Sequence, residues 1–121
     1  MGDHGTEQII AAAIEVHRIL GPGLLEAIYE EALCHELLLR HIPVERQKAV
    51  NVLYKDAIIK GQRLDLVVSN EVVVEIKSVR KMDDSYTAQL LSYLKSTGLK
   101  RGLLINFAGK RLVDGVKRIS L

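Results

Sequence analysis

Tryptophan is absent from this chain of 121 residues, and aromatic side chains are few: four tyrosines and one phenylalanine. The single cysteine, Cys34, excludes an internal disulfide and is typical of a reducing compartment, so we expect a cytoplasmic protein. No apolar run is long enough to span a bilayer, and no Cys/His cluster has zinc spacing, so neither a membrane nor a zinc site is expected. The length, without repeats or linkers, predicts a single domain over residues 1–121, with residues 1–5 disordered.

The net charge is small, but its sign differs between the two parts of the chain. Residues 1–75 carry 7 Lys/Arg and 12 Asp/Glu, a net charge of −5. Residues 76–121 carry 10 Lys/Arg and 3 Asp/Glu, a net charge of +7. A basic segment of this kind can face phosphates, and an ordinary solvated surface explains it equally well.

Hydrophobic periodicity predicts two helices at the start of the chain, from Thr6 to Leu20 and from Leu24 to Arg40, separated by Gly21-Pro22-Gly23. A third helix is expected from Asp83, which can cap it, to Thr97. Strands are expected at 44–53, 57–59, 63–68, 72–78, 101–106 and 116–120. This order predicts an α/β (α+β) fold in which helices flank a mixed sheet: two helices, an antiparallel meander, a crossover helix and further strands.

The helical spacing also predicts which side chains the first two helices bury. On the first helix they are Ile9, Ile10, Ala13, Ile14, His17 and Leu20. On the second helix they are Leu25, Ile28, Tyr29, Ala32, Leu33, Leu37 and Leu38.

Two apolar strands, Arg63–Val68 and Val72–Lys77, carry charges that fall on one face. Because side chains alternate along a strand, Leu64, Leu66 and Val68 are expected on the other face. Isolated charges are costly to bury in an apolar strand. A chain that keeps an aspartate, a glutamate and a lysine there is therefore expected to use them together.

The register of this hairpin follows from its loop. A three-residue loop over 69–71 pairs Val68 with Val72 and so places Asp65 opposite Glu75. A two-residue loop would place Asp65 opposite Ile76 and divide the charged set between the two faces. The hydrophobic pattern therefore favours the three-residue loop.

Opposed carboxylates repel each other, and a cation should compensate them. Mg²⁺ or Mn²⁺ suits this set because hard cations take carboxylate and carbonyl oxygens, here Asp65, Glu75 and the carbonyl of Ile76. Such an ion polarises a phosphoryl oxygen and activates water, which Lys77 can orient. The alternative is a surface ion pair between Glu75 and either Lys77 or Arg63.

Four motifs occur in order along the chain: Gly23-Leu24-Leu25-Glu26-Ala27-Ile28-Tyr29, the set Asp65…Glu75-Ile76-Lys77, a helix over 83–95 that carries Gln89, and a strand over 103–107. On these motifs the chain resembles the GxxExxY proteins, a compact branch of the PD-(D/E)XK nuclease superfamily, over about residues 8–120. Leu64 stands where a superfamily proline can precede the aspartate, which removes no catalytic group.

The resemblance implies a restriction-endonuclease-like αβββαβ core with an extra N-terminal helix, and a Mg²⁺- or Mn²⁺-dependent nuclease that acts on nucleic acid, DNA rather than RNA. It implies that Glu26 is a further metal or water ligand, that Asp65, Glu75 and Ile76 hold the metal, and that Lys77 serves the attacking water. Gln89 would lie near the site, with Tyr29 and Arg63 contacting substrate. Tyr29 fits equally well as a core side chain.

Two other classes of function stay open on the sequence. A non-catalytic nucleic-acid-binding or regulatory module could use the same fold and its basic segment. A structural or dimerising protein would have no affinity for nucleic acid. A homodimer that wraps its substrate is a further expectation at this chain length.

Overall fold

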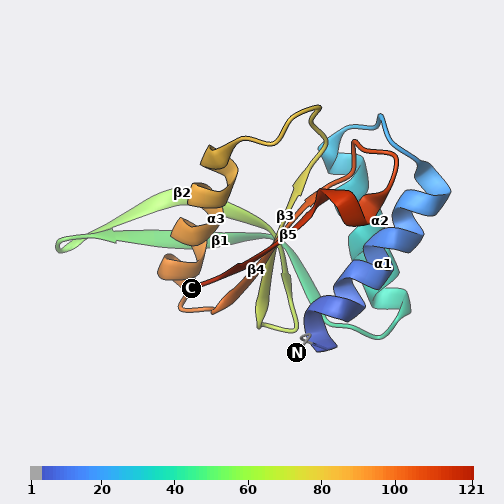
Figure 1. Ribbon diagram of the computed structural model, residues 1–121. Coiled ribbons are helices and arrows are strands. Elements are labelled where there is room, and N and C mark those ends of the chain that lie inside the picture. Colours follow the sequence, from blue (N-terminus) through green and yellow to red (C-terminus); the bar gives the residue numbers. More distant parts are fainter. Residues whose placement is uncertain (1–3) are drawn as a thin grey trace.

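A five-stranded mixed sheet lies between two layers of helices in this computed structural model, which describes residues 4–121 (Figure 1). The elements are α1 (His4–Leu20), α2 (Glu26–Leu39), β1 (Val44–Tyr54), β2 (Ala57–Val68), β3 (Val72–Lys77), α3 (Asp84–Thr97), β4 (Arg101–Asn106), a 3-10 turn (Leu112–Gly115) and β5 (Val116–Ser120). The strand order is β1-β2-β3-β4-β5, and only β3 and β4 pair in parallel. The predicted α+β architecture with crossover helix α3 is confirmed.

Two differences from the sequence prediction change the elements themselves, whereas the other boundaries agree to within two residues. The strands expected at 57–59 and 63–68 form one strand, because Gly61 takes a left-handed conformation within a register shift and the pairing with β1 continues past it. Helix α1 already includes His4, so positions 4 and 5 of the expected disordered start are helical, and Thr6, the expected first residue of the helix, lies buried inside it. Residues 1–3 lie outside the described part of the chain.

Each face of the sheet has its own apolar core. Helices α1 and α2 cover one face, where Ile9, Leu33 and Leu37 pack against Val74 and Ile105. Helix α3 covers the other face, where Leu90 and Leu94 pack against strand side chains that include Val67, Val73 and Leu104. Both faces of β3 are therefore buried, and a charged side chain on this strand has to be explained by its neighbours.

The apolar stripes of α1 and α2 are narrower than the spacing predicts. Of the expected core side chains, those that are instead exposed are Ile14, Leu20, Leu25, Ile28 and Leu38. Because the two helices share one sheet face, each buries only a narrow strip, and on α1 this strip includes Ala12 and Val16. Leu25, 77% exposed, precedes the first residue of α2.

One residue in β1 reverses the alternation of side chains. Gln47 has φ 49°, in the left-handed region, and it is not paired with Asp65, although Arg46 and Lys48 on either side of it keep their partners in β2. As a result Leu66 packs with α1 and α2, whereas Leu64 packs in the α3 core. The expectation that Leu64 and Leu66 share a face is wrong, since a left-handed residue in the neighbouring strand turns the ribbon at this point.

Gly115 allows the chain to pass close to the end of β4. A Cβ atom at this position would overlap the backbone oxygen of Asn106. We expect Gly115→Ala to lower the free energy of unfolding by about 1–3 kcal/mol, because backbone must move to make room. Urea unfolding would measure the loss. Gly109→Ala is the matched control: its nearest contact would be an ordinary 3.8 Å, and an equal loss there would contradict the explanation.

Candidate active site

The β2–β3 hairpin has the predicted register. Val68 pairs with Val72 and Val67 with Val73, and the loop between the strands consists of residues 69–71. The ladder ends at the next pair, Leu66 with Val74. The following residues, Asp65 and Glu75, therefore lie where the two strands begin to separate.

At this fork, formed by Asp65 and Glu75, side-chain carboxylates instead of backbone carbonyls accept the hydrogen bonds of the main-chain N–H groups. The backbone N–H of Asp65 donates to Oε1 of Glu75 at 3.2 Å, and the N–H of Ile76 donates to Oδ2 of Asp65 at 2.8 Å. Both acidic side chains are thus oriented by main-chain donors, and the backbone groups exposed by the fork are satisfied.

Glu75 is buried, with only 5% of its surface exposed. Burial and the negative charge of Asp65 raise the pKa of Glu75 to about 8, against the weaker opposing effect of Lys77. A buried carboxyl group beside a second carboxylate holds a proton at neutral pH unless a cation replaces that proton. This site is therefore suited to bind positive charge.

Lys77 and two tyrosines line the α3 side of the fork. The Nζ atom of Lys77 lies 4.4 Å from the centroid of the Tyr86 ring, a cation–π contact that directs the ammonium group toward α3. Tyr93 is buried, and burial together with the charges of Glu75 and Asp65 raises the pKa of its phenol. Gln89 is exposed and lies one helical turn from both tyrosines, on the same side of α3.

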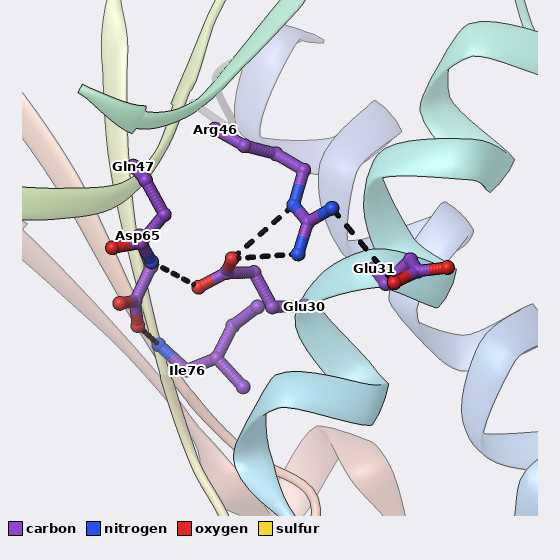
Figure 2. Close-up of polar contacts among 6 residues, drawn as sticks. All are labelled: Glu30, Glu31, Arg46, Gln47, Asp65 and Ile76. Carbon is purple, nitrogen blue, oxygen red and sulfur yellow. Dashed lines mark hydrogen bonds and ion pairs between the residues drawn. The ribbon is translucent and has the colours of Figure 1, made fainter.

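A carboxylate that the sequence analysis did not assign, Glu30, approaches the fork from α2 (Figure 2). Its Oε2 accepts from Nε and Nη2 of Arg46 at 3.2 and 3.1 Å, and its Oε1 accepts from Nε2 of Gln47 at 2.8 Å. Burial and the nearby charge of Asp65 raise the pKa of Glu30 despite these donors. Glu30 is thus close enough to Asp65 for the two carboxylates to repel each other.

A signal for Glu30 was present in the sequence. Glu30 lies outside the apolar pattern of α2, but it is an acidic residue four positions after Glu26, and residues at this spacing share a helix face. Gln47 and Arg46 gave no comparable signal, because their contact with Glu30 depends on the left-handed turn in β1.

The other predicted residues have the following positions. Glu26 is exposed, and its Oε2 accepts from the N–H of Ser78 at 3.2 Å, directly after Lys77. Arg63 is exposed and donates to the carbonyl of Gln47 at 3.1 Å.

Tyr29 is fully buried, stacks on Phe107 with ring centroids 4.4 Å apart, and donates its hydroxyl hydrogen to the carbonyl of Gly21. Its contacts are those of the core alternative, so we do not assign it to substrate.

The fork has a donor set that fits a hard divalent cation. Within residues 4–121, no three His, Cys, Asp or Glu side chains converge as a ready metal cluster. Asp65 and Glu75 do meet, and Mg²⁺ is commonly held by one or two carboxylates, with waters completing its shell. The raised pKa of Glu75 agrees with this, because a cation would relieve the same repulsion that the proton now relieves.

The mixed sheet with flanking helices, and the paired carboxylates where two of its strands separate, are consistent with a restriction-endonuclease-like fold. A model of the PD-(D/E)XK nuclease superfamily matches residues 3–119, and the chain belongs to this superfamily. Its members generally use divalent metals, and their substrates are nucleic acids.

Comparison with solved structures agrees on the fold. The crystal structure of SSO0001 is similar to this chain with a TM-score of 0.50 at 19% sequence identity, and the match covers 95% of this chain and 77% of that one. At this identity the likeness concerns the fold alone. Among curated proteins, no sequence matches the chain. No helix in residues 4–121 has the length and apolar character needed to cross a membrane.

Proposed function

We propose that this protein is a Mg²⁺- or Mn²⁺-dependent nuclease of the GxxExxY branch that hydrolyses phosphodiester bonds of nucleic acid. The observation that carries the proposal is the Asp65–Glu75 fork, where the buried Glu75 and the half-buried Asp65 are oriented by main-chain donors next to Lys77. The intact motif from Gly23 to Tyr29 supports the choice of branch. The cysteine content supports a cytoplasmic location.

Asp65, Glu75 and the carbonyl of Ile76 would hold the metal, which when bound supplies a Lewis acid for a phosphoryl oxygen and acidifies the attacking water. Lys77 would orient that water and offset negative charge as it builds on the phosphate. In the hydrolysis, water forms a new P–O bond, the P–O bond to the leaving sugar oxygen breaks, and the proton of the water passes to solvent or to the leaving oxygen. Tyr86 holds the ammonium group of Lys77 in place.

Helix α2 would supply the third acidic group. Glu30 is the stronger candidate, because it is buried, fixed by Arg46 and Gln47, and coupled to the charge of Asp65. Glu26 would act from the Lys77 end of the site, where it contacts Ser78. Gln89 and Arg63, both exposed at the margins of the fork, would contact the nucleic acid.

Lys77→Ala tests the catalytic assignment. Single- and double-stranded DNA and RNA would be incubated with the protein and Mg²⁺ or Mn²⁺, and cleavage would be followed on denaturing gels. We expect metal-dependent cleavage that falls by about 10²-fold or more in the variant, the usual contribution of a side chain that positions or moves a proton. Lys81→Ala, which removes an exposed charge four residues away, is the control.

The same assay separates nuclease activity from a non-catalytic nucleic-acid-binding module. Binding without turnover under all metal conditions would favour the module and end the enzyme proposal. Equal residual cleavage in the two lysine variants would mean that Lys77 has no special role. Light scattering coupled to gel filtration would test the expected homodimer separately.

A further inference from the structure

A second charged feature lies beyond the fork, at the carboxyl ends of the parallel strands β3 and β4. The chain segments that follow these strands enclose an open pocket of about 620 Å³. This volume falls within the range of about 300–1,000 Å³ that is typical of small-molecule sites. Crevices at the carboxyl ends of parallel strands are common binding positions in open sheets.

The charged side chains that line the pocket are Arg80, Lys110, Arg111 and Asp114. Three cations and one anion leave a positive balance. None of the three cations makes an ion pair within residues 4–121. The positive charge of this pocket is therefore available to a ligand.

The two segments that form the pocket are held in place by side-chain hydrogen bonds. Asn106 is buried, accepts from the N–H of Val79 at 3.1 Å and of Ala108 at 3.2 Å, and donates to the carbonyl of Val79 at 2.9 Å. From α1, the ring Nε2 of His17 contacts the carbonyl of Gly109 at 2.9 Å. The cations are therefore carried by a fixed backbone, which lowers the entropy lost when a ligand binds.

The pocket begins next to the fork. Asn106 pairs with Lys77 in the β3–β4 ladder, and the carbonyl of Lys77 accepts from the N–H of Phe107 at 2.9 Å. Val79, which lines the pocket, is two residues beyond Lys77, a backbone span of at most about 7 Å. A strand that places one phosphate at the fork can therefore reach the pocket with a neighbouring nucleotide.

We propose that the pocket formed after β3 and β4 binds a phosphate group of the nucleic-acid strand through Arg80, Lys110 and Arg111. This inference rests on the proposed function for its ligand class, but it assigns a different set of residues. Guanidinium groups bind phosphate oxygens in pairs, and Lys110 adds a point charge. The pocket would fix the position of the strand relative to the carboxylates.

The test measures binding without catalysis. A short fluorescein-labelled single-stranded DNA would be titrated in EDTA and its anisotropy followed at several salt concentrations. We expect Arg80→Ala, and the double variant Lys110→Ala/Arg111→Ala, each to weaken binding by about tenfold and to reduce the salt slope by about 0.7 for each phosphate that the variant no longer neutralises. Lys100→Ala, an exposed lysine before the opposite end of β4, is the matched control and should bind like the unaltered protein.

Equal weakening in Lys100→Ala and the pocket variants would overturn the proposal, because it would mean diffuse attraction by surface charge. Unchanged binding in the pocket variants, or no binding by the unaltered protein at low salt, would overturn it as well. Because EDTA prevents metal-dependent turnover, failure of the nuclease assay leaves this measurement intact. The three cations are exposed, so near-equal melting temperatures should exclude misfolding as the cause.

A second pair of DNAs identifies the phosphate. One carries a 5′-phosphate and the other a 5′-hydroxyl group on the same sequence. If the pocket holds a strand end, the 5′-phosphate strengthens binding to the unaltered protein, and Arg80→Ala removes this gain. If the two DNAs bind equally and Arg80→Ala weakens both, the pocket holds an internal phosphate.

Discussion

Asp65→Asn should abolish Mn²⁺ binding in titration calorimetry and lower metal-dependent cleavage by about 10³-fold or more, because a bound metal contributes several kcal/mol of transition-state stabilisation. Asparagine keeps the shape of the side chain and an oxygen that can accept from the N–H of Ile76. The fork should therefore stay folded while it loses the negative charge that a cation requires.

Asp56→Asn is the matched control for this experiment. Asp56 is an exposed aspartate in the turn between β1 and β2, at the other end of the same strand. The Asp56→Asn variant should bind Mn²⁺ and cleave nucleic acid like the unaltered protein. Retention of Mn²⁺ binding in Asp65→Asn would show that the fork is not the metal site, whatever happens to cleavage.

The stability of the metal-free protein should fall as the pH rises from about 4.5 to about 8. The pKa of Glu75 is about 4.5 in an unstructured chain and is raised to about 8 in the fold. Between these values the folded state binds a proton that the unfolded state has released, so the contribution is fully present below about pH 4.5 and is lost as the pH passes through about 8. The loss is on the order of 2 kcal/mol, after allowance for coupling to Asp65.

Urea unfolding in EDTA at a series of pH values measures this slope. Glu75→Gln should flatten the dependence of stability on pH, because the amide does not titrate. Glu30→Gln should remove only a part of this dependence, since the pKa of Glu30 is raised as well. Mn²⁺ should stabilise the protein most at the alkaline end, where the carboxylates are charged. A stability that rises with pH in EDTA would contradict the raised pKa of Glu75.

The register of the central hairpin was predictable because it depends on parity alone. Val68 and Val72 flank a loop whose length decides which face every later side chain occupies. The opening of the ladder beyond Leu66 and Val74 was not predictable in this way. It depends on Asp65 and Glu75 replacing backbone acceptors, and this requires their three-dimensional positions.

The buried faces of the helices were harder to predict because both N-terminal helices carry more apolar side chains than they bury. Leu25 and Ile28 belong to the apolar pattern but are exposed, whereas Glu30 breaks the pattern and is buried. Periodicity ranks positions by residue type, so it favours an exposed leucine over a buried glutamate. The partners of Glu30 lie in β1, 16 and 17 residues later, and no local pattern links them.

The left-handed residue Gln47 has a consequence for association between molecules. β1 is an edge strand of the sheet, and a long edge offers unpaired backbone groups to other chains. Gln47 interrupts the regular edge, and Glu45, Arg46 and Lys48 place charges on both sides of the interruption. The residue that holds Glu30 toward the fork therefore also makes this edge a poor template for strand addition, which protects the protein from aggregation.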